Sequence, residues 1–284
     1  MFIRPIGRPF PRRRPQGPDN QNSDGQEVEE EFYPSYEDVL KVRFLLLEKI
    51  KLDGLPLEVV DMIVDAAEYW PSNEVALDDK RTIRKDVDRA VLCTSPLCYA
   101  ENTLDTLSPK LLPHRTIHPC RKIIFSITSH DQGGHAIQVS DPVHPKMYEG
   151  SFTWFDTEVI HNAHQKPQMD RIREEMNPSN MSPRHFGPND PLLLPRENAL
   201  QRNRARIQQA KRHTIVWHYL DNTPPDSPEE EELVRDHGRG RGTLAGKQVR
   251  EMELGDSIII WARARFPGWV NYVDELSVRI FWAV

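Results

Sequence analysis

Histidine is the first residue type to test for chemistry, because its imidazole ligates metals and transfers protons. The 284-residue chain has eleven histidines, and they come close together in three places: His114 and His118, His130 and His135, His161 and His164. These pairs lie in polar segments without a helix or a Cys or Asp pattern that would hold a metal geometry. We therefore interpret them as solvated loop residues and expect no metal and no cofactor.

Nucleophilic and acid–base chemistry has equally little support. Gly-x-Ser-x-Gly, the P-loop and His-Glu-x-x-His are all absent. The three cysteines, Cys93, Cys98 and Cys120, have the wrong spacing for a metal site and no fourth ligand, and are typical of strand core residues. Carboxylates gather in acidic runs, which lack the apolar surroundings that raise a pKa for acid–base work. We therefore expect a protein that is not an enzyme.

Arginines and aromatic residues near the carboxyl end form a pattern that favours ligand binding. Alternation along residues 257–265 places Trp261, Arg263 and Arg265 on one strand face. Arginine beside aromatic rings binds carboxylates, phosphates or sugars. The turns at 131–134 and 266–269 would lie at one end of a two-sheet fold, where binding loops gather. The candidate ligand-binding residues are Asp131, Gln132, Trp154, Arg263, Arg265 and Trp269.

A structural alternative explains the same residues. The tryptophans would pack between the sheets, and the arginines would pair with Asp156, Asp274 or Glu275. The sequence leaves both interpretations open.

The elements that carry these residues are mainly strands. From about residue 88 the hydrophobic period is two, and the expected strands are 89–99, 122–129, 151–156, 214–220, 249–254, 257–265 and 276–284. Long loops are expected at about 135–148, 162–212 and 221–246, with a possible short helix at 198–209. We expect an antiparallel β-sandwich of jelly-roll type over residues 88–284. The alternating residues Leu276, Val278, Ile280, Trp282 and Val284 place the last strand in the core.

Several motifs in this region resemble a known domain. They are His-Asp-Gln-Gly at 130–133, Tyr-x-Gly-Ser-Phe-Thr-Trp-Phe-Asp at 148–156, Leu-Gln-Arg-Asn at 200–203, and the segment 255–269. Together they resemble a β-domain common in filamentous-fungal proteins, some of which also carry an F-box-like or ankyrin part. The resemblance covers most of residues 88–284. It implies a galactose-binding-like β-sandwich and no particular activity.

Two helices precede the strands. Ser35 to Asp38 has the pattern of a capping box, and Gly54 ends the helix that follows. Pro56 begins a second helix, because proline is tolerated in the first turn. Pro71 ends it. The pattern predicts a helical hairpin within residues 35–80.

The second helix resembles the opening of an F-box, with Leu-Pro-x-Glu-Val followed by an Ile-Val helix. The family implies a helical module that docks on a Skp-type adaptor of a cullin–RING ubiquitin ligase, while a carboxyl-terminal domain captures a client protein. The resemblance carries the adaptor-binding role to Leu55, Pro56, Glu58, Val59, Ile63, Val64 and Trp70. Residues 71–85 are more polar than the family pattern. The alternative is a helical hairpin that only caps the β-domain.

Charge and proline are distributed unevenly. Residues 1–18 hold five of the 24 prolines and five arginines without an acid, so residues 1–34 are expected to form a disordered tail, with a nuclear import signal as the sharper interpretation of Arg4–Arg14. The net charge is −6, and most of the imbalance lies in the expected tail and loops, so the folded part indicates no nucleic-acid partner. No apolar run is long enough for a membrane span. Few cysteines fit a reducing compartment, cytoplasmic or nuclear.

The sequence therefore favours a non-enzymatic interaction protein, an F-box-type substrate receptor that links an unknown client to a cullin–RING ligase. The alternative is a lectin-like or small-ligand-binding β-sandwich module.

Overall fold

The computed structural model describes residues 32–50, 54–134, 147–177, 179, 183–196, 199–224, 227–240 and 246–284. Residues from Tyr33 to Val284 form one compact unit. Of the expected tail at 1–34, residues 1–31 lie outside the described residues. Most of the expected loop at 135–148 also lies outside them.

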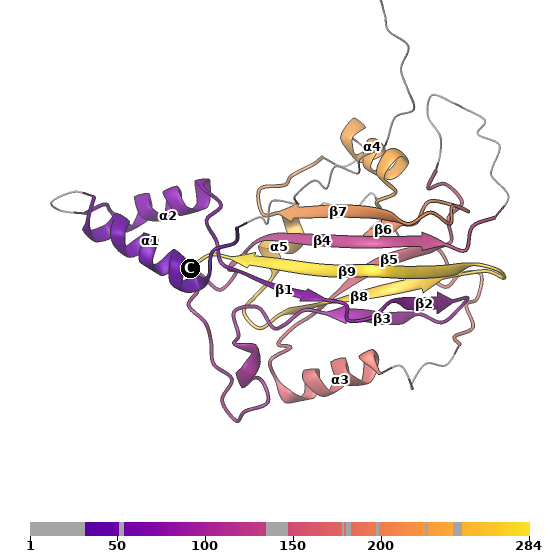
Figure 1. Cartoon of the computed structure of the whole chain (residues 1–284), viewed down its shortest axis with the longest axis horizontal. Helices are drawn as coiled ribbons and strands as arrows, with labels where there is room; N and C mark the ends of the chain where they lie inside the picture. The colour runs from indigo at the N-terminus through magenta and orange to yellow at the C-terminus, as the bar shows by residue number, and fades with distance from the viewer. Residues whose placement is uncertain are drawn as a thin grey trace, which may run out of the picture. The chain divides into compact units, whose positions relative to one another are not determined.

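Two antiparallel sheets, packed together, make up most of this unit (Figure 1). The first sheet has the order β1 (Ser72–Ala76), β9 (Val270–Trp282), β4 (Cys120–Asp131), β7 (Lys211–His218), with β2 (Arg81–Arg84) paired to β9 further along the same edge. The second has the order β3 (Arg89–Cys93), β8 (Ser257–Ala264), β5 (Thr153–Ile160), β6 (Gln201–Arg202). The expectation of a mainly β, antiparallel fold is confirmed.

The core lies where alternate residues of the long central strands point inward. Ile123, Phe125 and Ile127 of β4 have no exposed surface. The five residues expected on the inner face of the last strand, from Leu276 to Val284, are all buried. Burying a side chain of this size contributes roughly 1.5–3 kcal/mol relative to exposure. The prediction that the last strand belongs to the core is confirmed.

The helical hairpin consists of α1 (Tyr36–Glu48) and α2 (Leu57–Ala66), beside one end of the sheets in Figure 1. Ser35 forms the expected capping box with Asp38, whose carboxylate accepts a hydrogen bond from the Ser35 backbone N–H. Gly54 has a φ of +68°, and a Cβ there would lie 1.7 Å from the Leu47 carbonyl oxygen, so the close turn between the helices requires glycine.

The remaining helices are α3 (Lys166–Met176), α4 (Pro228–His237), α5 (Gly246–Glu251) and the short 3₁₀ turn η1 (Glu101–Thr103). In Figure 1, α3 lies beside β3 and α4 lies on the β7 side. No helix in the described ranges is long and apolar enough to cross a membrane.

Several boundaries differ from the sequence-based expectation. The helical segment expected to reach residue 80 ends at Ala66, because residues 72–76 and 81–84 pair with β9. The expected strand 249–254 is the end of α5 and a turn, since Val249 and Met252 are buried at helical spacing. The segment expected as a possible short helix, 198–209, contains β6 and turns from residue 199 on.

Two of the expected loops carry helices, and one strand is shorter than expected. The loop 162–212 contains α3, and the loop 221–246 contains α4. The strand expected over 89–99 ends at Cys93.

Candidate functional site

Five of the six residues expected to bind a ligand are buried in the folded unit, and the sixth, Gln132, is half-buried. Asp131 is fully buried, and its carboxylate accepts hydrogen bonds from the backbone N–H groups of Gly133 (2.8 Å) and Arg206. Burial raises the pKa of the Asp131 carboxyl. The Gln132 side-chain oxygen accepts a hydrogen bond from Val270 N at 2.9 Å. Both side chains therefore stabilise the turn after β4.

The two arginines form a buried charge cluster with two carboxylates. Arg263 Nε donates to Asp156 Oδ2 at 2.5 Å, and Arg263 Nη1 donates to Asp88. The Arg265 side chain has no exposed surface, and its Nη1 donates to Asp88 Oδ1 at 2.5 Å. Arg265 also lies under the ring of Phe186, with 3.6 Å from Cζ to the ring centroid. Arg263 therefore pairs with Asp156, one of the partners that the structural alternative named. The pairing of both arginines with Asp88 was not expected.

The two tryptophans are packed as well. Trp154 is fully buried, and its Nε1 donates to Asp156 Oδ2 at 3.0 Å. Trp269 is 8% exposed and meets Phe152 edge-on, with 5.2 Å between ring centroids. The six residues therefore lie in three separate places and form no common site. Two are in the turn after β4, three are in the buried charge cluster, and Trp269 packs against Phe152.

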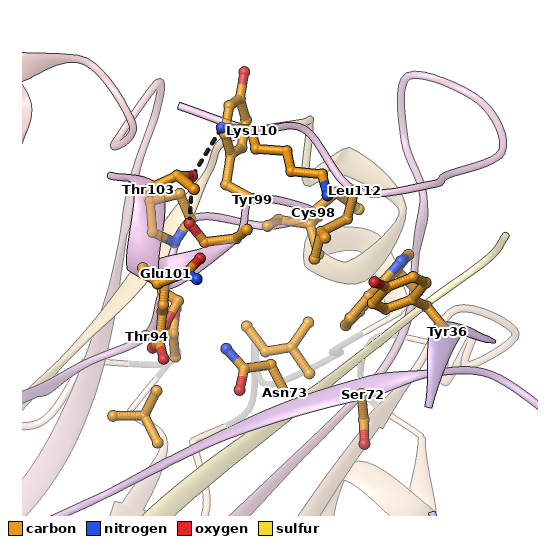
Figure 2. Close-up of a pocket in the computed structure, with 18 residues that line it drawn as sticks. Tyr36, Ser72, Asn73, Thr94, Cys98, Tyr99, Glu101, Thr103, Lys110 and Leu112 are labelled. Atoms are coloured by element: carbon orange, nitrogen blue, oxygen red, sulfur yellow. Dashed lines mark hydrogen bonds between the residues drawn. The ribbon is translucent and has the colours of Figure 1, made fainter. Parts of the chain in front are cut away.

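An open pocket of about 450 Å³ lies elsewhere, between the start of α1, β1 and the segment 94–112 (Figure 2). Its lining includes the apolar side chains of Val75, Ile280 and Trp282. Figure 2 shows the Asn73 amide low in the pocket, the Tyr36 ring at one side and the Lys110 side chain across the top. The sequence did not predict this pocket, because its lining comes from four separate segments: the start of α1, β1, segment 94–112 and the end of β9.

Hydrogen bonds hold the upper wall of this pocket. Lys110 N donates to Thr103 Oγ1 at 2.8 Å, and Thr103 Oγ1 donates to the Ala100 carbonyl at 2.7 Å. Ser95 Oγ donates to the Glu101 carboxylate. The thiol that lines the pocket, Cys98, has its pKa raised by burial, so it stays protonated and is a poor nucleophile. The pocket therefore offers binding groups rather than an activated nucleophile.

The helical hairpin presents a second candidate surface. Of the sixteen large apolar residues that are exposed in the described chain, eight lie between positions 40 and 63. They are Leu40 (39% exposed), Phe44 (56%), Leu45 (51%), Ile50 (56%), Leu57 (50%), Val59 (39%), Met62 (70%) and Ile63 (41%). Soluble proteins rarely expose apolar side chains in such concentration unless the surface binds something.

The residues expected to bind an adaptor divide into two groups. Val59 and Ile63 are exposed on α2, and Pro56 and Glu58 are exposed at its start. Leu55 is half-buried. Val64 and Trp70 are buried in the main core, so these two hold the hairpin on the sheets rather than face a partner. Leu40, Phe44, Leu57 and Met62 are exposed as well, although they were not among the residues expected to bind an adaptor.

Two carboxylates of α2 pair with an arginine of α1 and with an arginine of the segment before β4. Arg43 Nη1 and Arg115 Nη1 lie 2.5 and 2.9 Å from Asp61 Oδ1. Arg115 also pairs with Asp65, which accepts a hydrogen bond from Trp70 Nε1 at 2.9 Å. Burial acts to raise the pKa of Asp61, but the hydrogen bonds from the two arginines hold it below its usual value. The exposed apolar residues therefore stand on a helix whose orientation is held by several interactions.

Among the described residues, no group of three or more His, Cys, Asp and Glu side chains is placed to hold a metal ion. No family model, curated protein or solved structure matches the chain.

Proposed function

We propose that the protein is a non-enzymatic interaction protein, a substrate receptor that docks through α1 and α2 on a Skp-type adaptor of a cullin–RING ubiquitin ligase, while the two-sheet part captures a client protein. The observation that carries this proposal is the concentration of exposed apolar side chains on the two helices. The Leu-Pro-x-Glu-Val motif at the start of α2 supports the choice of adaptor. We also propose that the two packed sheets form a β-sandwich of jelly-roll or galactose-binding-like class.

The arrangement of side chains on α2 supports docking in a groove. Val60 and Val64 face the core, whereas Val59, Met62 and Ile63 are exposed at the spacing i, i+3, i+4. This spacing is what an amphipathic helix uses when it lies in a partner's hydrophobic groove. The helix is thus apolar on two faces, and the β-domain covers only one of them.

The experiment is affinity co-purification from a cell extract, using the whole chain as bait. We expect a Skp-type adaptor in the wild-type eluate and its loss in the double variant Met62→Glu with Ile63→Glu. Both side chains are exposed, so the fold should survive, which circular dichroism would verify. Leu220→Glu is the matched control, because Leu220 is 67% exposed and lies outside the helices. No adaptor with the wild-type bait, or equal loss with the control, would overturn the proposal.

A second candidate function rests on the pocket of Figure 2: binding of a small neutral polyol such as a monosaccharide. The volume of about 450 Å³ suits a ligand of this size, and the mixed apolar and hydroxyl lining is what sugar rings require. The Asn73 amide offers a donor and an acceptor to neighbouring hydroxyls.

A screen of glycans and metabolites tests this candidate. Asn73→Ala should weaken any hit by about tenfold, or about 1.4 kcal/mol. Trp269→Ala should leave the hit unchanged, because Trp269 is not among the residues that line the pocket. A hit that Trp269→Ala weakens and Asn73→Ala does not, or no hit across a broad screen, would reject the pocket as the ligand site.

A further inference from the structure

A cluster of cationic side chains lies where the two sheets end next to each other. β7 is the last strand of the first sheet, and β6 is the last strand of the second. The segment after α4 joins them, since Gly238 O accepts from Arg202 N at 2.8 Å and Arg239 Nη2 donates to Thr214 O at 3.1 Å. Figure 1 shows α4 on this side of the sheets.

The cluster surrounds His213 and Tyr148. Lys211 Nζ donates to the Tyr148 hydroxyl at 2.8 Å, and the Tyr148 and His213 rings lie 6.0 Å apart. Tyr148 is held in place by Gly238, where a Cβ would fall 2.3 Å from the tyrosine ring. The tyrosine hydroxyl accepts from Lys211 and keeps its own hydrogen for another acceptor.

The charges in this cluster are not balanced within the described residues. Arg204, Lys211 and Arg239 form no ion pair with a carboxylate there, whereas Arg263 and Arg265 do so elsewhere in the chain. Burial lowers the pKa of His213 to about 4, and its strongest electrostatic neighbours, which are all cationic, add to this shift. His213 is therefore neutral at pH 7 and can still donate one ring N–H.

Several donors of the cluster also lack a hydrogen-bond partner. They are the buried Nε atoms of Arg202, Arg204 and Arg239, and Nε2 of His213. His213 is only 8% exposed, so its unpaired nitrogen is not simply facing bulk solvent. Buried polar atoms in native proteins are almost always paired, which means that such a set of donors indicates an absent acceptor.

We propose that this cluster binds a phosphate group, either inorganic phosphate or the phosphate of a small monoester. Arg204, Lys211 and Arg239, which have no carboxylate partner among the described residues, suit a doubly charged oxyanion with several acceptor oxygens, and the planar guanidinium matches two of these oxygens at once. A carboxylate carries too little charge to balance the cluster. A nucleic acid is disfavoured, because His213 and Tyr148 are buried and the chain carries a net charge of −6. The site uses elements other than α1 and α2, so it does not depend on adaptor docking.

The test is calorimetric titration of the whole chain with sodium phosphate and, separately, with glycerol 3-phosphate, in buffers of matched ionic strength. We expect saturable binding of at least one of them, and a rise in thermal stability that sodium chloride does not produce. Tighter binding of glycerol 3-phosphate would identify a monoester as the ligand, and tighter binding of phosphate would identify the free ion. Both outcomes support the site.

Variants locate the binding. Arg239→Gln and Lys211→Gln should each weaken it at least tenfold. Arg212→Gln should not, because Arg212 is exposed and alternates to the opposite side of β7 from His213. As a measurement that needs no variant, the His213 ring followed by NMR should titrate at higher pH with phosphate present, since an anion stabilises imidazolium. No binding of either probe at millimolar concentration, an unmoved His213 titration, or equal weakening by Arg212→Gln would overturn the proposal.

Discussion

Two groups of half-buried or buried arginines in this protein differ in whether the described chain supplies carboxylates that pair with them. Arg263 and Arg265 lie against Asp88 and Asp156, so their charge is balanced by the chain itself. Arg204 and Arg239, between the two sheet edges, bond to backbone carbonyls and keep unpaired Nε atoms. The comparison separates a charge cluster that holds the fold together from one that is suited to an external anion.

The largest expected effect is the removal of the shared carboxylate from the balanced cluster. Asp88→Asn should lower the free energy of unfolding by about 3–5 kcal/mol, because two buried guanidinium groups lose their common partner. Denaturant unfolding at neutral pH measures this. A loss below about 1 kcal/mol would mean that the cluster is not balanced by Asp88, and the contrast between the two groups would fail.

Acid should destabilise the unbalanced cluster through His213. Its pKa is about 4 in the folded chain and 6.5 as the reference value, so the unfolded chain binds the proton first as the pH falls. Stability is therefore present above about pH 6.5 and falls between pH 6.5 and 4, by about 3 kcal/mol in total. The groups that face His213 and oppose its charge are Lys211, Arg204, Arg239 and His237.

Comparison with His213→Gln isolates this effect from the carboxylates that titrate in the same range. The variant should lose less stability than wild type between pH 7 and 4.5. Added phosphate should reduce the loss in wild type and leave the variant less affected. Parallel pH profiles would show that His213 is not responsible.

The smallest expected effect is the loss of one arginine from the unbalanced cluster. Arg239→Gln should change the free energy of unfolding by no more than about 1 kcal/mol, since no carboxylate among the described residues loses its partner and repulsion from Lys211 and Arg204 is relieved. Arg265→Gln is the matched change in the balanced cluster and should be far more destabilising. If the two variants lowered the free energy of unfolding equally, the distinction between the balanced and the unbalanced cluster would be wrong.

The sequence pattern identified most of the long strands, because alternation and β-branched residues are local signals. It did not identify β1 and β2, which are short and polar and become strands only through their pairing with β9. It placed a strand at 249–254, where Val249 instead lies in α5 and Met252 directly follows the helix, both buried at helical spacing. Short apolar runs of this kind are ambiguous until the rest of the fold decides which face is covered.

The candidate sites were harder to predict than the strands. The Arg–aromatic pattern at 261–265 was an accurate description of one strand face, but the sequence could not show that Asp88 and Phe186 cover it. The pocket between α1, β1 and segment 94–112 was missed, because no single segment carries a recognisable motif for it. The hairpin was anticipated, yet only packing distinguishes the buried Val64 from the exposed Met62.

By itself, the sequence determined which segments alternate, where the hairpin turns and that the last strand is a core strand, since capping, glycine turns and hydrophobic period act between neighbours in the chain. Only the tertiary structure decided which charges have partners. A guanidinium is neutralised by whatever carboxylate the fold brings within about 3 Å, and Asp88 reaches Arg263 and Arg265 across 175 and 177 positions. The same long-range packing left Arg204, Lys211 and Arg239 without such a partner among the described residues, and it is this difference that points to a binding site.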